Sequence, residues 1–460
     1  MTPKFAKLIQ MLKSETERGK LTWIAVDDDA FRARVGDGLV RVAKGIKRSE
    51  PESGEALLIP TIDIVVTGPT ARVVEPVGTR VRPLVPTTLA HPTYRVHGSL
   101  HMTTELGATT DDANFARLLE DVRGHVDRSL AAWLEPRVAV ASAVSAETGA
   151  AAEAVERLAV RGGKRMRAAL VAAAYVACSE EPSSGDAAAF AAVESAMLGI
   201  ELLQVYLLIH DDWMDDDDVR RGGPSVHVHL RERLGSKALG DAAAILAGDL
   251  ACSYAQMALL ECKQSAERVL AAARAFARIQ EEVVTGQLAE MSSAASVEVI
   301  HALKTASYTV TGPLALGAHL AGASEARVAQ LARYGRPLGI AFQLRDDLLG
   351  AFGDTSATGK PVGNDIRQGK RTALIVEMRG DAANEALLGR VLGRHDASDA
   401  EVAEVVRAME SSGAKARVEA RVAELLAEAR AALETLGLPQ GSRGKQWLAG
   451  AVRALGERSA

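Results

Sequence analysis

The sequence predicts a large all-α domain that follows a small β-rich module. Aromatic residues make up only 4% of the chain and alanine is plentiful, which favours helices packed closely through small side chains. Strand-like alternation is confined to the first part of the chain, up to about residue 74. The 460 residues exceed the roughly 250 to 300 at which a single core stops growing, so two units are expected.

The β-rich module is expected over residues 1–85, as an α+β unit with a short helix. Apolar residues recur at helical spacing over residues 5–12. Alternating runs at 31–35 and 39–42, joined by a Gly-Asp-Gly turn, predict a hairpin, and further alternation follows over 62–74. We expect the module to dock a partner protein; covering a site in the larger domain and aiding solubility are the alternatives.

A linker rich in proline and threonine is expected over residues 86–110. His91, His97 and His101 lie in or near its turns, but no cysteine or carboxylate completes a metal-ligand set with them. We therefore interpret these histidines as ordinary loop residues.

Charge and composition exclude several classes of protein. Lys and Arg total 54 against 59 Asp and Glu, a net charge of −5, so neither a nucleic-acid-binding protein nor an acidic disordered chain is expected. The N-terminus lacks the apolar core of a signal peptide, and no later apolar run reaches about 18 residues without a charge. We expect a cytoplasmic protein without a transmembrane segment, whose three cysteines are reduced.

Residues 111–460 have a helical pattern dominated by Ala, Leu, Glu and Arg. Short breaks rich in Gly, Pro or Ser separate the expected helices, near residues 149, 182, 222, 235, 312, 322 and 353 to 363. About 350 residues of helix predict a single bundle, unusually large unless something fills its centre.

The most informative segment joins an apolar helix to a run of carboxylates. Residues 201–210 are almost continuously apolar, and six aspartates follow within positions 211–218. Negative charge at a helix C-terminus opposes the macrodipole, and neighbouring carboxylates repel one another, so a compensating cation is expected. Asp211 and Asp215 lie on one helix face, where their oxygens can jointly hold Mg²⁺. A solvated acidic turn is the alternative.

A second acidic pair, Asp346 and Asp347, follows another apolar stretch that should be buried. Two such helix ends facing each other across a bundle would form a cage of oxygen ligands, open on one side to the oxygens of a substrate phosphate. The second pair is weak evidence alone and strong evidence together with the first.

Basic residues of phosphate-binding character stand at separate places along the chain. They occur in GGKRMR at 162–167, RRG at 220–222, Lys304, GKP at 359–361, and Lys370 with Arg371. Glycine lets the backbone approach an anion, Lys supplies a point charge and Arg a two-pronged donor. The usual glycine-rich nucleotide-binding loops are absent from the sequence.

Together these motifs resemble those of the trans-type isoprenyl diphosphate synthases, or polyprenyl synthetases. The motifs follow that family's order and spacing: GGKRMR at 162–167, DDxxD at 211–215 with RRG after it, LKTA at 303–306, FQLRDD at 342–347 and TGKPVGND at 358–365. The likeness covers about residues 111–460, and residues 1 to about 105 have no counterpart in it. It implies an isoprenoid-synthase-like helical bundle with a deep central cavity, a homodimer, and isopentenyl diphosphate and an allylic diphosphate as substrates.

The resemblance assigns two sets of binding residues. Three Mg²⁺ ions bridging the allylic diphosphate would be held by Asp211, Asp215 and Asp346. The same diphosphate would be gripped by Arg220, Lys304 and Lys360. Isopentenyl diphosphate would be bound by Lys164, Arg167, Arg221 and Gln204. Gln204 stands where many relatives have His, so it would donate an amide hydrogen bond instead of a charge.

The implied reaction is ionisation of the allylic C–O bond, followed by attack of the double bond of isopentenyl diphosphate on the carbocation. Metal ions, Lys and Arg would stabilise the leaving diphosphate. The Thr305 hydroxyl and the Gln343 amide oxygen would stabilise the cation through their dipoles. The departing diphosphate would remove the final proton, so no protein base is required.

Two positions depart from the family pattern. The second acidic motif ends in Gly350 where many relatives have Asp. Asp346 is the residue expected to touch metal directly, while Asp347 and Asp354 would act through water. Glu290 replaces an Asp common in the family and retains the charge.

Product length is expected to depend on what closes the cavity below Asp211. At about 1.5 Å per residue, Tyr206 lies roughly 7 to 8 Å down the helix on nearly the same side, with Leu207 beside it. A large ring there suggests a short product, farnesyl or geranylgeranyl diphosphate. An ordinary core position for Tyr206 is the alternative.

Three other functions are alternatives to a short-chain synthase. The first is a synthase of longer chains. A class I terpene cyclase would not need GGKRMR, since that segment serves the second substrate, and it carries an Asn/Ser/Glu metal motif where this chain has Asp346 and Asp347. A non-catalytic regulatory subunit typically loses the acidic motifs, and both stand here.

Overall fold

The structure is a computed structural model that describes residues 110–179, 185–292, 295–353 and 363–456, together with the backbones of six strands between residues 23 and 98. The chain divides into two compact units, Met1–Gly107 and Ala108–Ala460, and each is described by itself.

The strands of the first unit form one antiparallel sheet in the order β1-β2-β3-β4-β6-β5. Their bounds are β1 Trp23–Asp27, β2 Ala30–Val35, β3 Gly38–Ser49, β4 Leu57–Thr67, β5 Arg82–Pro83 and β6 Thr93–Gly98. β2 and β3 pair over Ala30–Val35 and Gly38–Ala43, the part of the chain in which a hairpin is expected. β6 lies inside the expected linker, because its β-branched and aromatic residues favour a strand despite the nearby prolines. The expected helix over 5–12 lies outside the described residues, and the predicted domain limits stay predictions.

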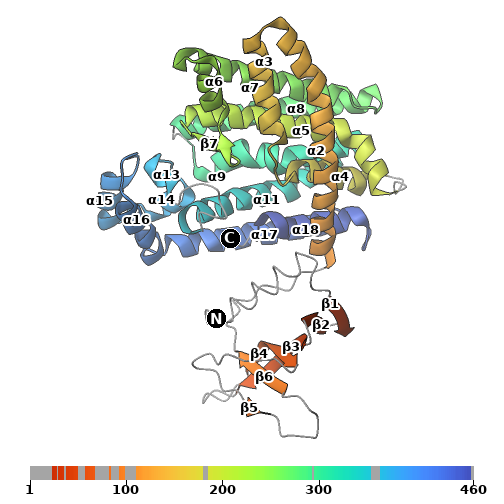
Figure 1. The fold of residues 1–460 in the computed structure, drawn as a ribbon, viewed down its shortest axis with the longest axis vertical. Helices are drawn as coiled ribbons and strands as arrows, with labels where there is room; N and C mark the ends of the chain where they lie inside the picture. The colour runs from red at the N-terminus through yellow and green to blue at the C-terminus, as the bar shows by residue number, and fades with distance from the viewer. Residues whose placement is uncertain are drawn as a thin grey trace. The chain divides into compact units, whose positions relative to one another are not determined.

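The second unit is a helical bundle, as predicted (Figure 1). Its elements are α2 Thr110–Val144, α3 Ala146–Val160, α4 Met166–Cys178, α5 Asp186–Met214, α6 Val226–Leu234, α7 Lys237–Leu260, α8 Ala266–Ser292, α9 Val297–Ile300, the π-helix η1 His301–Thr311, α10 Gly312–Leu320, α11 Glu325–Phe352, α13 Asn364–Arg367, α14 Ala373–Met378, α15 Ala382–Val391, α16 Asp399–Ser411, α17 Ala414–Thr435 and α18 Arg443–Gly456. A short hairpin of β7 (Val219–Arg220) and β8 (Gly223–Pro224) follows α5.

α5 is the central helix of the bundle. It packs against α2, α3, α4, α6, α7 and α10. Within the described residues, α5 and α7 have the length and apolar composition of a membrane span. α5 is mostly enclosed by its neighbours, with 61% of its apolar window buried, so its composition is explained by its central place in the bundle.

The π-helix η1 is held closely between α8 and α11 by two glycines. A Cβ at Gly286 of α8 would overlap the backbone nitrogen of Lys304, and one at Gly339 of α11 would overlap Ala306. The wide turn of η1 ends where the Gly312 amide donates to the Ser307 carbonyl, five residues back. Such turns occur often at functional sites, and this one places Lys304 and its neighbours between two helices that carry acidic residues.

Replacing Gly339 by Ala is expected to destabilise the protein, because the added methyl must force η1 and α11 apart. Overpacking of this kind costs about 1 to 3 kcal/mol. Urea unfolding of the variant measures the loss. The matched control is Gly389→Ala on the exposed face of α15, where an added Cβ meets no atom within 4 Å. That variant should be as stable as the wild type or slightly more so, and equal effects of the two changes would refute the packing argument.

Candidate active site

The first acidic motif forms the C-terminal end of α5. The Asp215 amide donates to the Asp211 carbonyl at 2.8 Å, which closes the last turn. Asp216 then adopts a left-handed φ of 52° and turns the chain toward β7. As a result Asp212 is fully buried, whereas Asp211 and Asp215 are partly exposed on one face of the helix.

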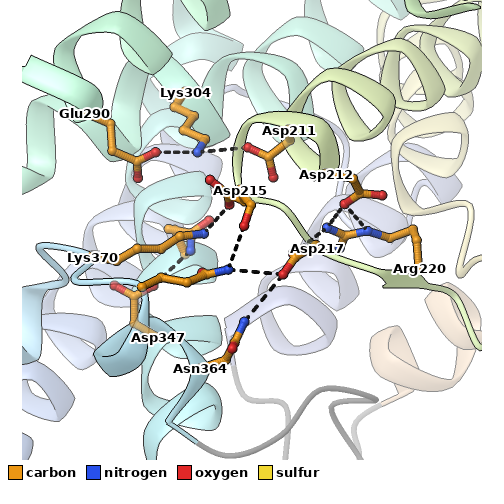
Figure 2. Close-up of polar contacts among 12 residues, drawn as sticks. Asp211, Asp212, Asp215, Asp217, Arg220, Glu290, Lys304, Asp347, Asn364 and Lys370 are labelled. Carbon is orange, nitrogen blue, oxygen red and sulfur yellow. Dashed lines mark hydrogen bonds and ion pairs between the residues drawn. The ribbon is translucent and has the colours of Figure 1, made fainter. Parts of the chain in front are cut away.

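Two lysines from distant segments bind the exposed carboxylates of this motif (Figure 2). Lys304 Nζ of η1 lies 3.4 Å from Asp211 Oδ1 and 2.5 Å from Glu290 Oε2. Lys370 Nζ lies 2.6 Å from Asp215 Oδ2. Burial acts to raise the pKa of Asp211, but Lys304, Lys370 and Arg220 together outweigh it and lower that pKa. Burial likewise acts against the charge of both lysines, and the carboxylates outweigh it and raise their pKa values.

Arg220 is bound within the turn that follows α5. Its Nε donates to Asp212 Oδ1 at 2.7 Å, a second nitrogen bonds the same oxygen, and Asp217 Oδ2 lies 3.4 Å away. Burial raises the pKa of Asp212 to about 6 in spite of this arginine. Asp217 also accepts from Gln368 at 3.1 Å and Asn364 at 3.5 Å, which ties the turn to the segment after α11 (Figure 2).

The second acidic motif continues into a chain of hydrogen bonds behind η1. The Thr305 hydroxyl donates to Gln343 Oε1 at 2.8 Å, and Gln343 Nε2 donates to Asp347 Oδ1 at 2.9 Å. His301 Nε2 lies 3.6 Å from the other Asp347 oxygen. Burial raises the pKa of Asp347 to about 7, with Asp365 and Asp346 adding to the shift. Asp346 itself is half-buried beside this chain.

A cluster of basic residues surrounds the loop before α4. Lys164 is exposed in the loop, while Arg167 is buried, donates to Thr309 Oγ1 at 2.9 Å and stacks 4.4 Å above the ring of Tyr308. Arg221 approaches the loop from the β7–β8 turn, with its guanidinium beside Gly163. Burial lowers the pKa of Arg221 to about 10, still well above neutrality. Three expected phosphate-binding residues therefore gather here, while Gln204 is half-buried on α5.

A cavity of about 250 Å³ opens beside the first motif. Asp211 and Lys304 line it together with apolar side chains of α5 and α8, including Tyr206, Leu207, Met214, Val283 and Leu288. The ring of Tyr206 packs edge-on against His210, with centroids 4.9 Å apart. Tyr206 and Leu207 thus lie in the cavity wall, and their role in setting product length stays a prediction.

The donor chemistry of the two motifs fits Mg²⁺, which prefers carboxylate oxygens. Among the described residues no three acidic, His or Cys side chains converge closely enough to hold an ion by themselves. Asp211 and Asp215 instead pair with lysines. Further oxygen donors are thus needed to complete a magnesium shell, and substrate phosphates and water commonly supply them. Lys360 and Asp354 lie outside the described residues.

The sequence indicates no role for several residues that complete this site. Lys370 was recognised only as one of several basic residues, although it forms the ion pair with Asp215. Gln368 lies outside the quoted motifs and Asn364 lies in TGKPVGND without an assigned role, because their contacts with the Asp217 turn join residues about 150 apart in the chain. His301 is three residues from Lys304, and this helical spacing was the available hint that it lies near the site.

Comparison with known proteins supplies independent evidence. The polyprenyl synthetase family matches residues 149–409. A short chain isoprenyl diphosphate synthase of Methanothermobacter thermautotrophicus is 34% identical over 62% of this chain and 83% of its own length. A (2E,6E)-farnesyl diphosphate synthase of Mycobacterium bovis is 36% identical over 56% of this chain and 70% of its own.

A solved structure agrees with these relatives. The crystal structure of a geranylgeranyl pyrophosphate synthase from Corynebacterium glutamicum, complexed with isoprenyl diphosphate and magnesium, superposes with a TM-score of 0.67 at 31% identity. The match covers 75% of this chain and 99% of that one.

Asp347→Asn is expected to stabilise the protein increasingly as the pH rises. The pKa of Asp347 is about 7 in the folded protein, against 3.8 for the ordinary group that the unfolded chain exposes. The stability that protonated Asp347 contributes is therefore fully present below pH 3.8 and is lost as the pH rises through 7. Asn stays neutral throughout, so its advantage in melting temperature over the wild type should grow from pH 5 to pH 8 in the presence of a chelator.

The comparison variant is Asp211→Asn, because the pKa of Asp211 is lowered and the sign reverses. Stability from ionised Asp211 is present above 3.8 and is lost as the pH falls, so this variant should be weaker than the wild type at pH 7 and approach it in acid. A pH-independent difference for Asp347→Asn would contradict the buried-acid interpretation.

Proposed function

The chain belongs to the polyprenyl synthetase family and is a prenyltransferase, and we propose that it joins isopentenyl diphosphate to an allylic diphosphate to give farnesyl or geranylgeranyl diphosphate. The observation that carries this proposal is the 250 Å³ cavity lined by Asp211 and Lys304 together with apolar side chains. Such a lining suits a substrate with a charged diphosphate and a hydrocarbon tail.

We infer that Asp211, Asp215 and Asp346 hold three Mg²⁺ ions. The magnesium in the Corynebacterium structure supports the identity of the metal. Bound magnesium neutralises a diphosphate and makes it a better leaving group. Lys304 and Lys370 keep their charge at neutral pH, because their pKa values are raised. Their positive charge lies where the leaving diphosphate develops negative charge, and so it stabilises the leaving group. We assign the same role to Arg220 and Lys360.

Thr305 and Gln343 are assigned to the carbocation. Their mutual hydrogen bond fixes both side chains, and the oxygen dipoles of a hydroxyl and an amide can stabilise a neighbouring positive charge without being attacked by it. Lys164, Arg167, Arg221 and Gln204 are assigned to isopentenyl diphosphate. The released diphosphate takes the final proton, and no side chain serves as the base.

We also infer a homodimer formed through α7 and α8. Both helices expose large apolar side chains, with Leu246, Met257 and Leu260 on α7 and Leu270, Leu288 and Met291 on α8 each 45 to 67% exposed. Burying such side chains between two copies is favourable, and sedimentation at twice the 48.5 kDa chain mass is the expected result. A cytoplasmic location and a docking role for the N-terminal unit are inferred from the sequence alone.

The direct test is incubation of the purified protein with Mg²⁺, isopentenyl diphosphate and, separately, dimethylallyl, geranyl and farnesyl diphosphates, with products identified by mass. Elongated prenyl diphosphates are expected, and a chelator should abolish them. Asp211→Asn should lower kcat/KM by about 10² to 10³. Hydrocarbon or alcohol formed from the allylic substrate alone would indicate a cyclase instead, and no turnover by the folded protein would indicate a regulatory subunit.

Tyr206→Ala is expected to lengthen the product, because the ring occupies the cavity wall below Asp211. Removing it opens room for further five-carbon units. Chain-length analysis by mass detection measures the change. Tyr206→Phe keeps the ring and should leave the product unchanged. An unaltered product distribution in the alanine variant would assign Tyr206 to ordinary core packing.

A further inference from the structure

Arg165 is the basic residue of GGKRMR that the proposed function leaves without a role. Its side chain is completely enclosed, in contrast to that of Lys164, the residue before it. It precedes the first residue of α4 with a left-handed φ of 49°, a conformation uncommon outside glycine. A buried guanidinium in such a backbone conformation must be held by strong local interactions.

The guanidinium of Arg165 joins three helices to the start of α4. Its Nε donates to Asp127 Oδ1 of α2 at 2.8 Å, and one terminal nitrogen donates to the Ala159 carbonyl of α3 at 2.7 Å. The other terminal nitrogen donates to Glu201 Oε2 of α5 at 3.1 Å. Every nitrogen of the group is therefore occupied by the protein, and none is directed to a ligand by these contacts.

Glu201 is equally buried, at 2% exposure, and it has a second contact with α4. Its other oxygen accepts the amide of Ala168, the third residue of α4, at 3.3 Å. The residue before α4 makes no side-chain capping bond of its own, so Glu201 supplies the missing cap from a neighbouring helix. Negative charge at this end also favours the helix dipole.

The Arg165 side chain also lies against the loop that carries the basic cluster. A Cβ at Gly163 would lie 3.6 Å from a nitrogen of Arg165 and 3.5 Å from one of Arg221, so both guanidinium groups lie against this loop. Arg221 is fixed in turn by donating to the Leu158 carbonyl at 3.1 Å. The position of Arg165 thus sets where Lys164 and Arg167 stand on either side of it.

We propose that Arg165 and Glu201 form a buried clamp that positions the loop 162–164 and the start of α4 for the diphosphate of isopentenyl diphosphate. Arg165 is a positioning residue in this arrangement and not a ligand. Glu201 and Asp127 compensate the charge of Arg165 within the clamp. The inference rests on the proposed function, in which that cluster binds isopentenyl diphosphate.

The test is Glu201→Gln, which keeps the size of the side chain and an acceptor for the Ala168 amide but removes the charge that holds Arg165. Calorimetry with isopentenyl diphosphate as the only organic ligand should show a Kd raised by about tenfold or more. The KM for this substrate should rise similarly, while kcat and the KM of the allylic substrate stay within about twofold.

The sign of the effect separates positioning from direct binding. If Arg165 were itself a ligand, removing the charge of its buried partner would free the guanidinium, and binding would tighten or stay the same. Either of those results overturns the proposal, as would an equal rise in both KM values. Asp241→Asn is the matched control: it also converts a carboxylate to an amide in an interhelical ion pair, with Arg231, and it should leave both KM values unchanged.

Two further measurements keep the outcomes distinct. If Glu201→Gln does not fold, Asp127→Asn removes the charge of the more exposed partner and should raise the Kd for isopentenyl diphosphate by about threefold. An unchanged Kd in this variant would overturn the proposed clamp. If the wild type binds isopentenyl diphosphate but forms no prenyl product, the proposed function fails, and the calorimetric comparison of variants still decides the role of Arg165.

Discussion

The concentration of carboxylates at the end of the buried helix α5 is the constraint on which the site depends. Charge at this end opposes the helix dipole, and like charges so close repel one another, so the carboxylates that are shielded from solvent require cations. Arg220 serves the buried Asp212 from within the same turn, whereas Lys304 and Lys370 reach Asp211 and Asp215 from far along the chain. The electrostatic requirement of one helix end therefore fixes the positions of two other segments.

This requirement explains why η1 is built as it is. Lys304 must reach the end of α5 while Thr305, the next residue, bonds Gln343 on α11. Adjacent residues of a helix point in different directions, and Gly286 and Gly339 let the helices on both sides come close enough for each contact. Small residues thus determine how closely the helices pack, glycine at the site and alanine throughout the core.

The sequence predicted what local pattern and motif spacing determine. The helical bundle follows from periodicity, and the structure confirms it. The β-rich module and the part that Tyr206 and Leu207 play in product length stay predictions, although both side chains line the cavity beside Asp211. The family follows from the combination of motifs, and the family comparison confirms it. The roles of the individual site residues stay predictions.

What the sequence could not provide is pairing across long separations. The contact of Lys370 with Asp215 joins residues 155 apart, and nothing in the sequence near either residue indicates that they pair. Arg165 shows the same limit more sharply. In sequence it stands between Lys164 and Arg167 as one more basic residue of a phosphate-binding segment, and only the fold reveals that its side chain is enclosed by three neighbouring helices.

The two proposed diphosphate sites differ in how their charge is balanced, and this difference bears on the reaction. Around the first motif, lysines and carboxylates alternate, so a diphosphate entering there meets carboxylates that repel it unless divalent ions come with it. Around the loop before α4, Arg165 is engaged by the buried Glu201 and the partly exposed Asp127, and Lys164, Arg167 and Arg221 bring further positive charge to the loop. We therefore expect the second site to bind a diphosphate without metal. Under the proposed function, the substrate that must ionise is thereby the one held with metal ions, while the substrate that must keep its diphosphate is held by basic side chains alone.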